Sequence, residues 1–132
     1  MALLITLTFA VTTILYNIPN TGTIVASPYL RLYYDKDCTL EYLNNTNVDW
    51  GTLTIGSNIH HWWVKNTGNC NITLTLTILS FPSGWSLSWN YTGQILEPSQ
   101  VLHILMQLQV PSGALKGAYT WTYRIGAEEA FL

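Results

Sequence analysis

The chain has few charged residues, and the first thirty, from Met1 to Leu30, include none. Charged side chains make up 9% of the 132 residues, and the net charge is −2. We expect no nucleic-acid partner, because no basic stripe is present to neutralise phosphates. The sequence also has no Gly-rich phosphate loop and no nucleophile–base or carboxylate pair at a catalytic spacing. We therefore expect neither enzymatic activity nor a cofactor.

Cysteine is scarce as well, with only Cys38 and Cys70 present. Two thiols are too few for a Cys-type metal site, and they do not form a Cys-x-x-Cys redox pair. We predict one disulfide, formed outside the cell; the alternative is two free buried thiols in a cytosolic domain. The bond would close a loop of about thirty-three residues and stabilise the domain by about 3 to 4 kcal/mol.

Two groups of potential metal ligands have a simpler interpretation. His60 and His61 are adjacent, so a strand directs them to opposite faces and they cannot both bind one ion without distortion. We expect His60 to point inward and His61 to point outward. Asp35 and Asp37 offer too few oxygens for calcium, which takes six to eight ligands, so a solvated turn is the better interpretation. No metal site is predicted.

The chain begins with a long apolar stretch. Residues 2–18 are mostly Leu, Ile, Val, Phe and Ala with scattered Thr. As a helix, these residues would span about 25 Å, just short of the hydrocarbon core of a bilayer. The basic start of a signal peptide is missing, and we expect the stretch to be retained in the mature protein. Since residues 19–22 (PNTG) favour a break, we predict an assembly segment, residues 1–22, and a surface domain, residues 23–132.

This apolar segment fits two periodicities. As a strand, the segment would alternate polar or small residues with the apolar residues Ile5, Leu7, Phe9 and Val11. A donor strand that completes a neighbour's sheet requires such an alternation. A helix would place one apolar stripe toward a filament core, at Leu4, Leu7, Val11, Ile14 and Ile18. We favour the helix because residues 2–4 and 13–15 break the alternation. In either form, we expect the segment to join copies of the chain into a polymer.

The remainder of the sequence predicts strands. It is rich in residues that favour strands, since the chain contains 17 Thr, 8 Tyr and 6 Trp. In residues 71–78 apolar side chains alternate with Asn and Thr, which is the period of a half-buried strand. About seven strands are predicted, at residues 29–34, 50–54, 59–65, 71–78, 85–91, 101–108 and 119–125. The expected fold is therefore α+β by count but mainly β, an N-terminal hydrophobic α-helix followed by an antiparallel β-sandwich.

Three Asn-x-Ser/Thr sequons occur, at Asn44, Asn71 and Asn90. Asn71 and Asn90 fall on the outward face of their predicted strands, and Asn44 lies in a polar loop. Because a sugar can be carried only where the side chain meets solvent, we predict covalent N-glycans at these positions.

Several short motifs resemble those of an archaeal Ig-like surface domain across residues 29–126. They are residues 49–53 (DWGTL), 64–69 (VKNTGN), 84–87 (GWSL), 110–111 (VP) and 117–119 (GAY). With the apolar segment in front, the whole chain resembles a mature archaeal type IV pilin. The resemblance implies a helical homopolymer on the cell surface, with a core of N-terminal helices and Ig-like domains displayed outside. It also implies a subunit that is inserted in the membrane before assembly.

The expected function is that of a structural pilin subunit of an extracellular archaeal filament used for adhesion. One alternative is a filament assembled by donor strands. Another is a monomeric, membrane-anchored module that recognises carbohydrate or a partner through Trp63 and Tyr33, and a third is an accessory domain of a secreted hydrolase. In a filament, Trp63 and Tyr33 would instead lie between subunits.

Overall fold

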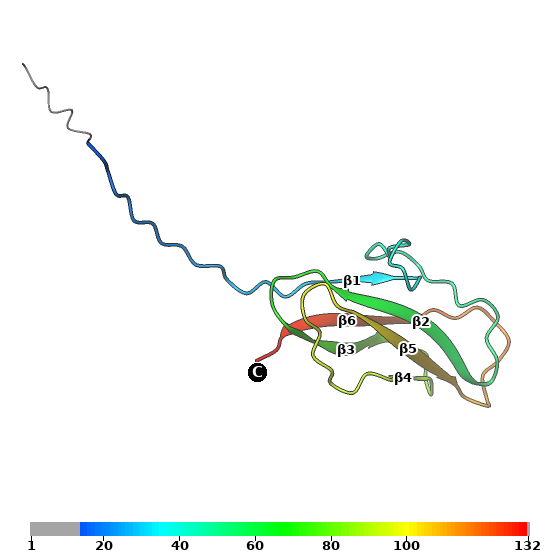
Figure 1. Ribbon diagram of the computed structural model, residues 1–132. Helices are drawn as coiled ribbons and strands as arrows, with labels where there is room; N and C mark the ends of the chain where they lie inside the picture. Colours follow the sequence, from blue (N-terminus) through cyan, green and yellow to red (C-terminus); the bar gives the residue numbers. More distant parts are fainter. Residues whose placement is uncertain (1–13, 132) are drawn as a thin grey trace, which may run out of the picture.

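The computed structural model describes residues 14–131, and within this range the fold is all-β. Six strands form two antiparallel sheets, one with the order β1-β2-β5-β4 and one with the order β3-β6. The sheets lie face to face in a body from which the N-terminal part projects (Figure 1). The strands are β1 (Leu30–Tyr33), β2 (Gly56–Asn66), β3 (Ile72–Ser80), β4 (Ser86–Trp89), β5 (Val101–Val110) and β6 (Thr122–Glu129).

The core lies between the two sheets, where the period-two pattern of the sequence places it. β2 and β5 pair over ten residues and form the centre of the larger sheet. Their alternate side chains point inward, as predicted for Trp62, which is 2% exposed. The smaller sheet covers them with the first half of β3. The buried cluster comprises Trp62, Val64, Ile72, Leu74, Leu96, Ile104 and Met106.

The predicted N-terminal helix is wrong for the described residues. Residues 14–22 contain no helix, and all of them are exposed. Pro19 disfavours helical geometry at the residue before it, and the β-branched residues nearby favour extended backbone. Of the predicted helical stripe, Ile14 and Ile18 lie in this extended segment, whereas Leu4, Leu7 and Val11 lie outside the described residues. The α+β class is thus corrected to all-β, and no helix in residues 14–131 is long and apolar enough to span a membrane.

The count of about seven strands is also corrected, because residues 50–54 are not a strand. Local side-chain hydrogen bonds hold this segment in turns. Asp49 Oδ1 accepts from Gly51 N at 2.8 Å, and Gly51 has a positive φ of 71°. Asn58 then satisfies both backbone groups of Thr54, at 2.9 Å each. Such bonds offer the backbone an alternative to sheet pairing.

Candidate functional site: an open groove between the sheets

One side of the body is open and contains a groove of about 1060 Å³. Its walls are the connection from β1 to β2, residues 42–55, and the segment 114–125, which leads into and includes the first half of β6. Trp62 on the larger sheet and Tyr123 on the smaller one also line it. The volume is at the upper end of the range for ligand sites, about 300 to 1,000 Å³.

Aromatic rings form a continuous row along this aromatic groove. Neighbouring rings contact each other in tilted, stacked or edge-to-face geometry, and such pairs add to the energy of burial. The row joins the loops at one end of the body to the core in the middle. From the loop end, the pairs are Tyr119–Trp85, Trp85–Trp121, Trp121–Trp50, Trp50–His60 and His60–Trp62, with centroids 4.7, 5.7, 5.6, 5.3 and 4.5 Å apart.

Two polar features lie among these rings. Trp62 Nε1 donates a hydrogen bond to the Tyr123 hydroxyl at 2.8 Å and so joins the two sheets. Burial raises the pKa of Tyr123 to about 12. His60 lies between Trp50 and Trp62, and its buried Nε2 has no hydrogen-bond partner. Burial lowers the pKa of His60, with a further contribution from His61, so its position among the rings favours the neutral imidazole.

β6 borders the groove with a free strand edge. It pairs with β3 along one side, and the described residues show no backbone hydrogen bond from β6 to the 42–55 segment on the other side. β1 and β4, the edge strands of the larger sheet, have four residues each, whereas β6 has eight. An unpaired edge of this length presents a row of N–H and C=O groups that can pair with another strand.

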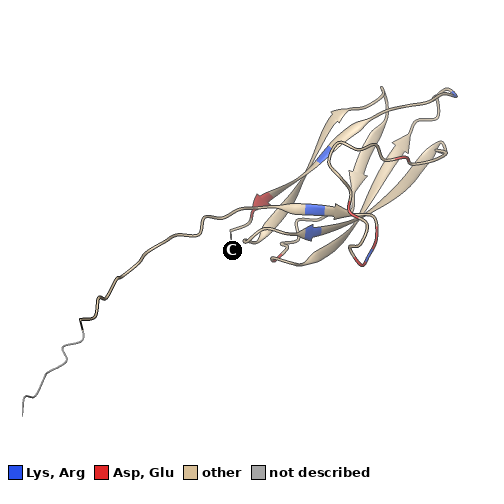
Figure 2. Cartoon of the chain, turned by 90° about the horizontal axis from the view of Figure 1, so that it is seen from above, with Lys and Arg blue, Asp and Glu red and all other residues tan. Residues whose placement is uncertain are grey.

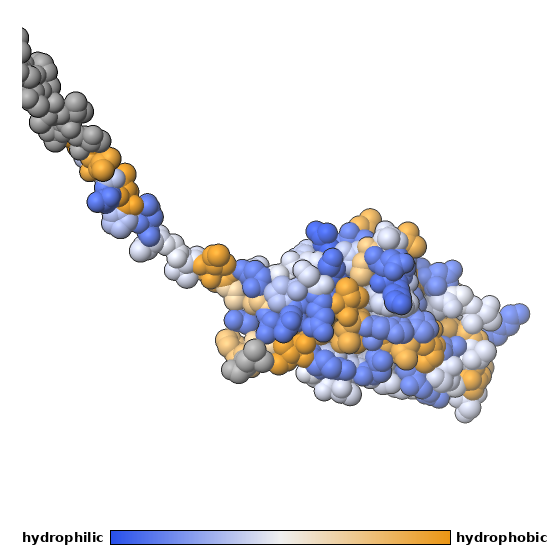
Figure 3. All heavy atoms as spheres, in the orientation of Figure 1, coloured by the Kyte–Doolittle hydropathy of each residue, from blue (hydrophilic) through white to orange (hydrophobic). Residues whose placement is uncertain are grey.

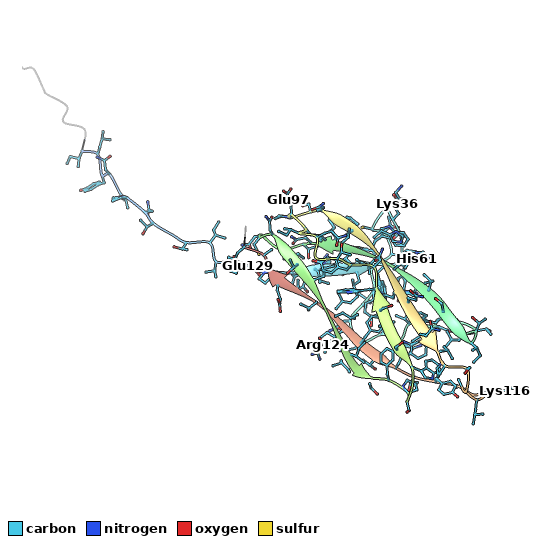
Figure 4. All side chains as sticks on the ribbon, turned by 90° about the horizontal axis from the view of Figure 1, so that it is seen from below. Lys36, His61, Glu97, Lys116, Arg124 and Glu129 are labelled. Atoms are coloured by element: carbon cyan, nitrogen blue, oxygen red, sulfur yellow. The ribbon has the colours of Figure 1, made fainter. Side chains whose placement is uncertain are left out.

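The N-terminal arm, residues 14–24, leaves the body at the end where β6 finishes. Asn69 fixes its root, because its Oδ1 accepts from Ser27 N at 2.7 Å and its Nδ2 donates to Val25 O at 3.0 Å. Gly68 lets its own segment approach the backbone of residues 27–29 closely. A Cβ at this position would lie 2.8 Å from Tyr29 N and closer still to Ser27 O. Figure 4 shows Glu129 near this root and Lys116 at the opposite end of the body.

The arm is uncharged and uncovered, and it exposes several large apolar side chains. Figure 2 shows charged residues only on the body, and Figure 3 shows hydrophobic residues along the arm. Ile14 is 72% exposed and Ile24 is 88% exposed, and Leu15, Tyr16 and Ile18 are similarly accessible. Large apolar side chains exposed together mark an interaction surface more often than isolated ones do.

A second aromatic group lies on the outer face of the larger sheet. His61 Nδ1 and His103 Nε2 are 2.9 Å apart, with ring planes only 11° from parallel, so one ring N–H donates to the other ring nitrogen. Trp63 packs against His103 with centroids 4.5 Å apart. The outward direction of His61, labelled in Figure 4, agrees with the sequence prediction. Burial, and then the proximity of His61, lowers the pKa of His103.

The structure places the two residues that were predicted to form a binding surface directly opposite each other on neighbouring strands. Trp63 is half-buried on the outer face, with part of its ring covered by His103. Tyr33, its partner in the β1–β2 pairing, is only 8% exposed, and the role of the pair in binding stays a prediction. Sequence reasoning also missed the groove residues Trp50 and Trp121, which it assigned to core strands. The usable signal was an excess of aromatic residues for a domain of this size.

The predicted disulfide is not formed in this structure, where Cys38 and Cys70 are free cysteines. Cys38 follows the end of β1, whereas Cys70 lies near the beginning of that strand, because Thr67 N donates to Tyr29 O. Burial raises the pKa of Cys38, which leaves its thiol less reactive.

The three sequons are all placed in the described part of the chain. Asn44 is exposed in a loop and lines the groove, so a glycan there would stand at its rim. Asn90 is exposed, and its Oδ1 accepts from Leu105 N at 2.8 Å. Asn71, directly before β3, is half-buried. Glycosylation stays a prediction at each position.

Within residues 14–131, no group of three or more His, Cys, Asp or Glu side chains could hold a metal ion. Asp35, predicted to lie in a solvated turn, accepts hydrogen bonds from Thr39 and from Leu40 N. These bonds, chiefly that from the Thr39 side chain, lower the pKa of the Asp35 carboxyl.

No protein family, no curated protein and no solved structure matches this chain. The groove, the free edge of β6 and the arm are the features from which a function can be inferred.

Proposed function

We propose that the chain is a structural subunit of an extracellular surface polymer, and that its N-terminal apolar segment makes the contact between copies. The observation that carries this proposal is the arm, residues 14–24, which projects from the body and leaves its own large side chains in solvent. Burying apolar surface is favourable by about 25 cal/mol per Å². An uncovered apolar arm is therefore stabilised when a neighbouring copy covers it.

The features of the body support the same proposal. The aromatic rings of the groove offer apolar contact surface, and the eight-residue edge of β6 offers unpaired backbone groups. These are the two requirements for taking up a strand. The sequons and the low content of charge fit a protein displayed outside the cell. Adhesion is the role we assign to the polymer, with the outer face of the larger sheet exposed on it.

The aromatic groove favours one other function, recognition of carbohydrate by a monomeric, anchored module. Indole rings such as Trp50, Trp85 and Trp121 provide apolar faces, and the polar residues 44–47 lie at the rim. Titration of the full-length protein with oligosaccharides, followed by tryptophan fluorescence, tests this candidate. Saturable binding by a monomer would favour it over polymerisation.

The polymer is tested by negative-stain microscopy and sedimentation of the full-length chain. We expect filaments or large oligomers for the parent sequence and loss of assembly for Leu7→Asp, which places a charge in the apolar segment. Asn20→Asp adds the same charge in the polar break of the arm and should retain assembly. A parent chain that stays monomeric at all concentrations would refute the proposed function.

A further inference from the structure

We propose that residues 5–11 of one copy add as a strand to the free edge of β6 in the next copy, and that their apolar side chains fill the aromatic groove. This inference rests on the proposed function and identifies the surface that receives the segment. The occupant is a second copy of this chain, and the acceptor site is incomplete without it.

The sequence of the segment matches the shape of the acceptor. Ile5, Leu7, Phe9 and Val11 are separated by Thr6, Thr8 and Ala10. In a strand the first set faces one side and the second set faces the other. Seven residues at about 3.3 Å each span about 23 Å, and the eight residues of β6 span about 26 Å, so the two lengths agree.

The face of β6 that borders the groove fits this alternation. Tyr123 and Ile125 line the groove, whereas Thr122 and Arg124, which also border it, are exposed at the surface. A strand added beside β6 directs every second side chain to the same side as Tyr123 and Ile125. The apolar set would then meet the row of aromatic rings, and the threonines would face solvent beside Thr122.

The position of the arm's root sets the direction of the added strand. The root lies at the end of the body where β6 finishes, since Asn69, which fixes the root, is two residues from Asn71, whose O accepts from Ala130 N at 2.8 Å. A neighbour placed head to tail inserts its segment from the opposite end, near Lys116, with its N-terminus toward Glu129 (Figure 4). The segment then runs antiparallel to β6, like every strand pair of the two sheets.

Insertion into the chain's own groove would have the opposite polarity. The segment would enter from the Glu129 end and run parallel to β6, after a reversal in the arm. The arm instead leads away from the body (Figure 1). Because the two arrangements pair different residues, cross-linking distinguishes them.

The test uses full-length variants with one added cysteine each. Donor chains carry Thr6→Cys or Thr12→Cys, and acceptor chains carry Glu128→Cys or Thr122→Cys, both exposed on β6. Donor and acceptor chains are mixed, assembled and oxidised, and disulfides are located by peptide mass spectrometry, which separates them from those of Cys38 and Cys70. The inference predicts interchain bonds for position 6 with 128 and for position 12 with 122. Bonds for 6 with 122 and for 12 with 128 would overturn it.

Two substitutions in the segment give an independent readout. Phe9→Asp places a charge in the groove and should weaken assembly at least about tenfold. Thr8→Asp places the same charge on the solvent side and should leave assembly near the parent level. Equal effects of the two variants would overturn the alternation.

The outcomes separate the inference from the proposed function. Filaments that form without any cross-link to β6 would refute the inference and leave the proposed function standing. A chain that carries both Thr6→Cys and Thr122→Cys, and that forms this disulfide only within itself, would refute the inference in favour of self-insertion. Chains that never assemble would refute both.

Discussion

Trp62 and Tyr123 form a hydrogen bond across the two sheets, with the indole Nε1 2.8 Å from the phenolic oxygen. Trp62 belongs to β2 at the centre of the larger sheet, and Tyr123 belongs to β6 at the edge of the smaller one. The bond therefore fixes the position of the free edge relative to the core. It also lies in the aromatic groove, so the same contact sets the groove's width.

Tyr123→Phe should destabilise the protein at neutral pH by about 1 to 3 kcal/mol, because the buried indole N–H loses its acceptor. Denaturant unfolding at pH 7 measures the change. At high pH the difference should shrink. The raised pKa of Tyr123, about 12, means that the stability it contributes is present below pH 10 and is lost as the pH rises through 12. A variant that unfolds at the same denaturant concentration as the parent at pH 7 would contradict the structural role of this bond.

Acid should destabilise the fold through His60. Its pKa is lowered in the folded state, so the unfolded chain binds the proton more tightly, and stability falls as the pH drops below about 6.5. His60→Phe keeps a ring between Trp50 and Trp62 but removes the titration. The free energy of unfolding, measured from pH 7.5 to 5, should depend less on pH in the variant. An unchanged pH dependence would show that His60 does not carry the effect.

Asn66 should be one of the most sensitive positions for stability. It is fully buried, its Nδ2 donates to Cys70 O and Leu96 O at 2.8 and 2.9 Å, and its Oδ1 accepts from Gly68 N at 3.0 Å. Asn66→Leu removes the partner of Cys70 O and of Gly68 N, whereas Leu96 O still accepts from Ile72 N at 2.9 Å, and we expect a loss of about 3 kcal/mol. Asn20→Ala, at an exposed arm position, should change stability by less than about 0.5 kcal/mol. Thermal or denaturant unfolding compares the two variants.

The inward-facing residues of the long strands were predictable from the sequence. The period of two places four side chains of β2 and β5 on the inward face, namely Trp62, Val64, Ile104 and Met106. Each is buried, and they pack in one cluster with Ile72 and Leu74 of β3. The pattern is local and strong, so it survives folding. The turns at residues 50–54 were not predictable from this pattern. The side chains of Asp49 and Asn58 bind backbone groups of Gly51 and Thr54 that would otherwise pair in a sheet.

The groove could not be derived from the sequence, since it depends on which strand edges stay unpaired. β6 pairs with β3, which lies some fifty residues earlier in the chain, and only this long-range choice leaves the other edge of β6 free. The helix prediction failed at residues 14–18, its described part, for a related reason. A helical stripe is stabilised by the surface that it packs against, and residues 14–22 pack against none.

Gly68 should control assembly through the root of the arm. In Gly68→Ala the new methyl group would collide with the backbone of Ser27 and Tyr29, which cannot move without displacing the arm. The hydrogen bonds from Asn69 Nδ2 to Val25 O and from Ser27 N to Asn69 Oδ1 would be strained or lost, and the arm would leave the body in a different direction. We expect fewer or irregular filaments by electron microscopy, while far-UV circular dichroism stays close to that of the parent. Gly113→Ala is the matched control, because nothing lies within 4 Å of its Cβ, and it should assemble normally. Equal assembly of both variants would show that the arm's direction at its root does not govern the contact between copies.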